Sequence, residues 1–333
     1  MAQPPSRTLS ICNSLATTDV LSIMVFSSAL LGLAAAATCF LVTSSISENK
    51  PLPWDGTGKD LAVTTLSKKF LTHILTMRNG SSNGNPENYV TIDPEGRSPA
   101  YNGDNSVINI GVDAKARFQN QTNLRRSELV QKVVANTKGT TFFRTSVMKK
   151  TPFLNKFAWQ IIFPEVKTFE IRVDATKSPP MLIYLNNGTW DAKYETEFVF
   201  GTWYNIGIAV KAATTGTGSV LDFYMSEGNE DLELKVTHEV VSEFPKDYEF
   251  HFGPLVYFET ETPPTMADNQ DILSYNGVMI LDEVETSGSE KGVQTSGSGK
   301  GEQTSGSGKG STYGPMVGGE SDPVIKPAKC ARK

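Results

Sequence analysis

The residues of this chain that could do chemistry are carboxylates that lie close to arginine or to apolar runs. The first candidate is the segment NLRRSEL at 123–129, in which Arg126 and Glu128 stand two residues apart. In an extended strand such residues share one face, so the guanidinium would hold Glu128 ionised. That arrangement suits a general base or an acceptor for a sugar hydroxyl. A solvent-facing ion pair is the alternative, and the pattern leaves both open.

The second candidate is Glu165, which follows the apolar run AWQIIF and a proline. An apolar environment would favour the neutral form that a general acid needs, although a plain turn carboxylate fits the pattern equally well. Glu170 and Arg172 alternate with apolar residues and are expected on a solvated strand face. His251 lies between two phenylalanines in FHFG at 250–253. It is either a buried structural residue or a donor to a sugar hydroxyl.

Other chemistries are disfavoured by what the sequence lacks. No nucleophile elbow, phosphate-binding loop or dinucleotide fingerprint is present. The three cysteines lie outside the central stretch and the three histidines are far apart, so we expect no disulfide framework, metal site or cofactor. A net charge of −5 argues against nucleic acid as a partner. Carboxylates and aromatic rings on a β scaffold are instead the groups that bind or cleave glycans.

The elements that must position these residues are predicted to be strands. Runs rich in Val, Ile, Phe, Tyr and Thr are separated by clusters of Gly, Asn, Asp and Pro. The predicted strands are 106–112, 126–134, 140–148, 158–163, 168–173, 181–185, 197–200, 204–210, 220–225, 234–239, 249–255 and 277–281. One helix is expected, around 60–77. About a dozen strands predict an all-β fold, a jelly-roll sandwich of two antiparallel sheets with a concave cleft.

Several short motifs, taken in order, resemble glycoside hydrolase family 131, whose members are fungal β-glucanases. The motifs are WDG at 54–56, YVTIDP at 89–94, RRSEL at 125–129, QIIFPE at 160–165, GTWYN at 201–205 and HFG at 251–253. RRSEL is the most specific of them, and the resemblance covers nearly all of the stretch 51–283.

The resemblance implies a β-jelly roll with an open cleft that hydrolyses β-1,3-, β-1,6- and β-1,4-linked glucan with inversion. It places the two catalytic carboxylates on Glu128 and Glu165, with a water molecule between them, and leaves open which is acid and which is base. Four further residues are expected to contact the glucan: Arg126, Trp159, Glu170 and His251. Trp159 stands where the family often has histidine, which favours a glucan-binding protein with an impaired active site as the alternative function.

The two ends of the chain differ from this central part. Residues 20–42 contain no charged side chain, which predicts either a cleaved secretory signal or an uncleaved membrane anchor. We favour cleavage and secretion, so a membrane is a partner only if the segment is retained. Three sequons, at Asn79, Asn120 and Asn187, are candidate glycosylation sites. The predicted organisation is therefore a signal and spacer at 1–50 and a hydrolase-like domain at 51–284.

The remaining segment, 285–333, begins with three nine-residue repeats that carry almost no apolar residue: TSGSEKGVQ, TSGSGKGEQ and TSGSGKGST. Such a sequence cannot bury a core and is expected to be a disordered tail.

Three hypotheses follow for the whole chain: a secreted, inverting β-glucanase, a lectin-like wall protein, or a surface protein anchored by its N-terminal segment.

Overall fold

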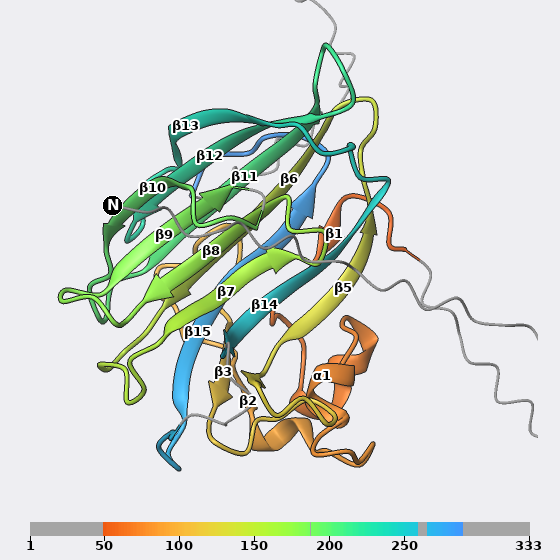
Figure 1. Ribbon diagram of the computed structural model, residues 1–333. Coiled ribbons are helices and arrows are strands. Elements are labelled where there is room, and N and C mark those ends of the chain that lie inside the picture. Colours follow the sequence, from red (N-terminus) through yellow and green to blue (C-terminus); the bar gives the residue numbers. More distant parts are fainter. Residues whose placement is uncertain (1–48, 187, 259–264, 289–333) are drawn as a thin grey trace, which may run out of the picture. The chain divides into compact units, whose positions relative to one another are not determined.

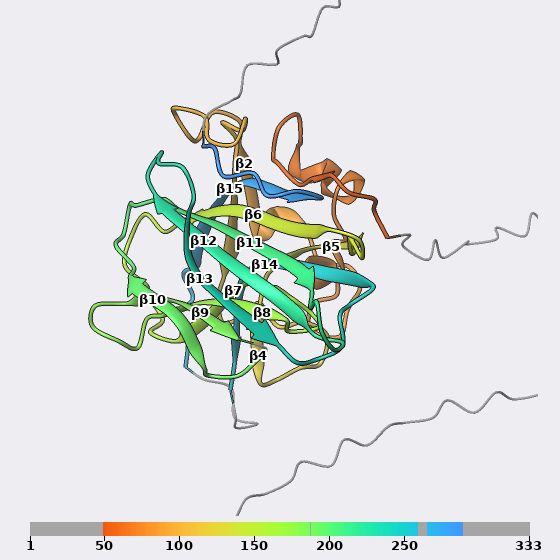
Figure 2. The ribbon, with the colours of Figure 1, turned by 90° about the horizontal axis from the view of Figure 1, so that it is seen from above.

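The computed structural model describes residues 49–186, 188–258 and 265–288. These residues form two antiparallel sheets that pack face to face as a β-sandwich (Figures 1 and 2). The all-β sandwich expected from the sequence is confirmed. The predicted signal segment, Asn187 and the repeats lie outside the described residues. Among the helices of the described ranges, none is long and apolar enough to cross a membrane.

The first sheet has eight strands and the second has seven. In the order of their pairing, the first consists of β13 (Glu233–Val240), β12 (Ser219–Glu227), β11 (Tyr204–Ala212), β6 (Thr140–Met148), β15 (Asp271–Leu281), β3 (Val107–Val112) and β2 (Val90–Asp93), with β1 (Trp54–Asp55) beside β15. The second consists of β10 (Ala192–Glu197), β9 (Met181–Asn186), β8 (Phe169–Asp174), β7 (Ala158–Pro164), β14 (Asp247–Tyr257) and β4 (Leu124–Arg126), with β5 (Leu129–Val134) also beside β14.

Alternation along the strands decides which side chains fill the core. In β8, Phe169, Ile171 and Val173 are fully buried against the first sheet, while Glu170 and Arg172 point to the other face. In β11, the alternating apolar residues are buried in the same way, as the sequence predicted. Burial of these apolar side chains supplies the main driving force for packing the two sheets. The outer face of the seven-stranded sheet is consequently left for polar groups.

The single helix expected around 60–77 is instead two short pieces: the 3₁₀ helix η1 (Val63–Lys68) and the helix α1 (His73–Thr76), which lies beside β5 (Figure 1). The interruption has a local cause. Leu71 between them forms an antiparallel bridge with Val130 of β5, and its N–H donates to the Val130 carbonyl at 2.7 Å. Pairing with the sheet thus replaces the helical hydrogen bonds that the apolar spacing suggested. A second 3₁₀ helix, η2 (Pro86–Asn88), precedes β2.

Candidate active site

A groove of about 430 Å³ lies on the outer face of the seven-stranded sheet. Its walls carry both charged and aromatic side chains. The lining residues are Gln121, Leu124, Arg126, Gln160, Phe163, Glu165, Lys167, Glu170, Arg172, Gly188, Leu255 and Tyr257. Three of the predicted site residues, Arg126, Glu165 and Glu170, therefore line one groove.

The predicted pair of Arg126 and Glu128 forms at a break between two strands. The sequence predicted one strand over 126–134, but β4 ends at Arg126 and β5 begins at Leu129. Gly253 and Pro254 of β14 lie opposite this break, and the pairing of β14 with β7 shifts register at the same place. Arg126 and Glu128 stand two residues apart, and both side chains lie on the face of the sheet that carries His251.

Gly253 permits this break. It has a φ of +138°, and a side chain there would collide with the Ser127 carbonyl and approach the Glu128 Cα within 2.8 Å. The adjacent Pro254 carbonyl accepts a hydrogen bond from the Ser127 N–H at 3.0 Å. From the other side, Arg78 donates to the Ser127 hydroxyl at 2.9 Å. The backbone that carries Glu128 is thus held from two directions.

Replacing Gly253 with alanine is expected to destabilise the domain and to disturb Glu128. The backbone strain alone costs about 1–3 kcal/mol, and the collision with Ser127 adds to it. The matched control is Gly216→Ala, at a φ of +79° with no atom within 4 Å, which should cost only the strain. Urea unfolding of both variants measures the difference. Equal losses of unfolding free energy would show that the contact with Ser127 is unimportant.

Glu128 is fully buried, and its carboxylate contacts the guanidinium of Arg126 and the imidazole of His251. Arg126 Nε lies 3.0 and 3.1 Å from the two carboxylate oxygens, and the guanidinium also pairs with Oε2 through Nη2. His251 Nδ1 lies 3.1 Å from the same Oε2. Burial alone would favour the neutral acid, but Arg126 and His251 outweigh it and lower the pKa of Glu128 to about 2.

His251 lies between Glu128 and the groove. Its Nε2 is 3.7 Å from a carboxylate oxygen of Glu165 and 3.5 Å from one of Glu249. The ring stacks on Phe163 of the neighbouring strand, with centroids 4.8 Å apart and planes inclined by 11°. The imidazole therefore joins a buried carboxylate to one that is exposed, since 60% of the Glu165 side chain is accessible.

The charges around His251 favour its protonated form. Burial disfavours the imidazolium, but the contacts with Glu128 and Glu249 raise the pKa of His251 above its ordinary value. The contact with His251 is also the main cause that lowers the pKa of Glu249 to about 2, and Lys132 assists from 3.1 Å away. The cluster thus favours the protonated form of the imidazole between these carboxylates.

These shifts predict a stability maximum in mildly acidic solution. A His251 pKa raised above 6.5 stabilises the fold fully below about pH 6.5, and this stabilisation disappears as the pH rises through the folded-state value. Glu128 and Glu249 stabilise above about pH 4.5 and lose their effect as the pH falls toward 2. We expect the melting temperature to be highest between these limits, with a weaker alkaline decline in His251→Gln. An identical alkaline decline in that variant would contradict this account.

The structure corrects two expectations about the site. Glu128 does not line the groove, because Arg126 and His251 enclose it, and the His251 ring occupies the space expected to hold water between Glu128 and Glu165. Trp159 does not meet substrate either. It is fully buried in the core, where its indole N–H donates to the Asn155 carbonyl at 3.1 Å and its ring stacks with Phe153.

Glu249 and Gln160 are site residues that were not predicted. Glu249 is two residues before His251 on β14, so strand alternation alone could have indicated that they share a face. Gln160 belongs to the quoted QIIFPE motif, and it lines the groove from β7. Glu170 also lines the groove, but it is held by an ion pair with Arg172.

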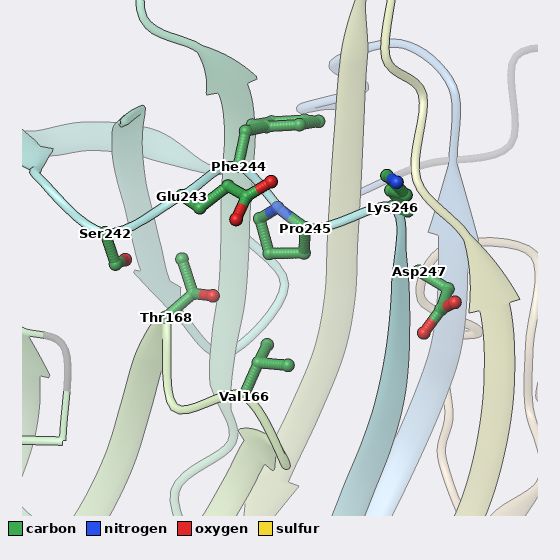
Figure 3. Close-up of a pocket in the computed structure, with 8 residues that line it drawn as sticks. All are labelled: Val166, Thr168, Ser242, Glu243, Phe244, Pro245, Lys246 and Asp247. Atoms are coloured by element: carbon green, nitrogen blue, oxygen red, sulfur yellow. The ribbon is translucent and has the colours of Figure 1, made fainter. Parts of the chain in front are cut away.

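A second hollow, of about 320 Å³, lies against the same turn that carries Glu165 (Figure 3). Val166 and Thr168 line it, whereas Glu165 and Lys167 line the groove, so alternate residues of the turn serve different hollows. The rest of its wall is the connection from β13 to β14, including Glu243 and the start of β14 at Asp247. None of the predicted site residues faces this hollow.

Within the described ranges, no group of three potential metal ligands is present.

Comparisons with known proteins find one matching family and solved structures of similar fold. The family described as glycoside hydrolase 131 catalytic N-terminal domain matches residues 52–286. A solved β-glucanase catalytic domain of this family from Podospora anserina is 21% identical, with a TM-score of 0.55 over 71% of this chain and 97% of that one. The corresponding catalytic domain from Coprinopsis cinerea is 19% identical, with a TM-score of 0.55 over 72% and 98%. Comparison with curated protein sequences finds no match.

Proposed function

The chain belongs to glycoside hydrolase family 131, and from this premise we propose that it is a secreted β-glucanase. Its substrate is β-1,3-, β-1,6- or β-1,4-linked glucan, and cleavage inverts the anomeric carbon. The observation that carries the proposal is the line of three groups from Glu128 through His251 to the exposed Glu165 at the groove wall.

The three groups have different tasks in this proposal. Glu165 is the carboxyl group that meets the glycosidic bond, because it is exposed in the groove. It gives a proton to the leaving glycosidic oxygen while a water molecule forms the new bond to the anomeric carbon. The proton that this water loses goes to solvent, and His251 Nε2 restores the proton on Glu165 and is reprotonated in turn. Glu128 does not touch substrate. Through Nδ1 it orients the imidazole and stabilises its charge, as a buried carboxylate does for a catalytic histidine in other hydrolases.

Inversion is proposed from membership of the family and not from the spacing of Glu128 and Glu165, because the buried Glu128 does not meet substrate. Inverting glycosidases place their two carboxyl groups roughly 6.5–9.5 Å apart across the scissile bond. Retaining enzymes bring their two carboxyl groups to about 5–5.5 Å. Proton NMR of the first sugar released, before it mutarotates, distinguishes the two outcomes.

The release of reducing sugar from laminarin, pustulan and cello-oligosaccharides tests the proposed activity. We expect the purified protein to cleave at least one of the three, and the preferred one to identify the linkage. No release from any of them, over prolonged incubation, would contradict the proposal.

A glucan-binding protein without hydrolytic activity is the second candidate. One observation favours it: the complete burial of Glu128, which keeps this carboxylate from the groove. The burial of Trp159 removes the argument that the sequence offered for it. Retention on immobilised glucan without release of sugar would support this second function.

Secretion and glycosylation remain part of the proposal. Asn79 and Asn120 are both exposed, and Gly80 and Asn120 lie next to each other, so glycans on these two asparagines would be neighbours. A loss of mass on treatment with an N-glycosidase, together with N-terminal sequencing of the secreted protein, tests both points.

A further inference from the structure

We propose that Trp190, Arg172 and Gln160 form a separate sugar-binding subsite of the groove, which binds a glucosyl unit away from the bond that is cleaved. This inference rests on the proposed function, since it takes a β-glucan chain as the ligand. It assigns a contact with substrate to residues that take no part in the proposed catalysis.

Trp190 is an exposed aromatic ring with a cation against one face. It lies in the connection between β9 and β10, and 65% of its surface is accessible. The Arg172 guanidinium carbon lies 4.5 Å from the ring centroid. Arg172 is itself paired with the buried Glu170. The ring is therefore supported from one side by a fixed cation, while much of it stays open to a ligand.

Gln160 supplies a polar group beside Arg172. It pairs with Arg172 across β7 and β8, so both side chains point to the groove face. The residue is 3% exposed, and its amide Nε2 has no hydrogen-bond partner among the described residues. An unpaired buried donor is unfavourable, and a hydroxyl oxygen of a bound sugar would satisfy it.

An exposed aromatic ring together with an unpaired amide donor fits a β-linked glucose unit. Such a ring has apolar faces that stack on aromatic side chains and equatorial hydroxyls that accept hydrogen bonds at its edge. The subsite is also distinct from the catalytic groups. Gln160 lies on β7 five residues before Glu165, a distance of roughly 16 Å along an extended strand, and Arg172 pairs with Gln160 at the same level. Only a chain of several sugar units would occupy both places.

The test is the dependence of hydrolysis on chain length. Trp190→Ala and Gln160→Ala in the full-length protein are expected to lower kcat/KM for long oligosaccharides of the preferred linkage by about tenfold. The loss should be markedly smaller for the shortest oligosaccharide that is cleaved. Trp190→Phe keeps an aromatic face and should restore most of the loss. The matched control is Leu234→Ala, an exposed residue on β13 of the other sheet, which should change nothing.

An equal loss at every chain length, or no loss in Trp190→Ala, would overturn the subsite. If the wild-type protein cleaves no oligosaccharide, the proposed hydrolase function fails but the subsite is still tested. Calorimetric titration with the longest soluble oligosaccharide then provides the result. Binding weakened about tenfold in Trp190→Ala supports the subsite, and unchanged binding rejects it.

Discussion

Replacing Glu165 with glutamine is expected to lower kcat on β-glucan by about 10²–10⁴-fold, the range that a positioned acid or base contributes. The amide keeps the size of the side chain but can neither give nor take the proton. Because Glu165 is exposed, the substitution should leave the fold and the melting temperature nearly unchanged. Glucan should still bind, since the groove keeps its shape. Initial rates and calorimetric binding measure the two effects separately.

The matched control for this variant is Glu239→Gln, an exposed glutamate on β13 of the other sheet. It loses one negative charge in the same way but lies on a different sheet from the groove. We expect its kcat to equal that of the wild type. A Glu165→Gln protein that keeps its rate within a factor of a few would show that another group carries the proton.

Replacing Glu128 with glutamine is expected to produce the largest loss of stability. The charge is fully buried between Arg126 and His251, so its removal leaves cations without a counter-charge in the interior. Breaking a buried pair by removing one partner costs about 3–5 kcal/mol. The matched control is Glu195→Gln, whose ion pair with Lys177 is about half exposed and should cost at most about 1 kcal/mol.

The same variant also tests the task assigned to Glu128 in catalysis. Without the carboxylate the pKa of His251 should fall, because Glu128 is a main cause of its rise. The alkaline limb of the kcat/KM profile would then shift to lower pH. A stable Glu128→Gln protein with an unchanged pH profile would contradict the role of Glu128 as the group that orients and charges His251.

Much of the fold could be predicted from the sequence because strand alternation is a local signal. The apolar residues of β8 and β11 alternate with polar ones, and this pattern alone assigns their core faces. The two short helical pieces could not be predicted, because the bridge from Leu71 to Val130 joins residues far apart in the chain. Apolar spacing carries no information about such a partner.

The sequence predicted residues of the candidate site but not the burial of Glu128. The pairing of Arg126 with Glu128 follows from their spacing, and the structure contains it. Burial of Glu128 depends instead on His251, which lies on a strand far along the chain, and on the close approach of Gly253 to the backbone of Glu128. Trp159 is a different case. Its alternation in β7 places it on the core face, whereas the motif it interrupts suggested a contact with substrate.

A crystal structure of the Glu165→Gln variant with a bound β-glucan oligosaccharide measures the contact between substrate and residue 165 directly. We expect the amide introduced by this substitution to lie within hydrogen-bond distance of a glycosidic oxygen, with Glu128 still enclosed by Arg126 and His251. An oligosaccharide whose glycosidic bond lies against an exposed Glu128, with Arg126 displaced, would contradict it.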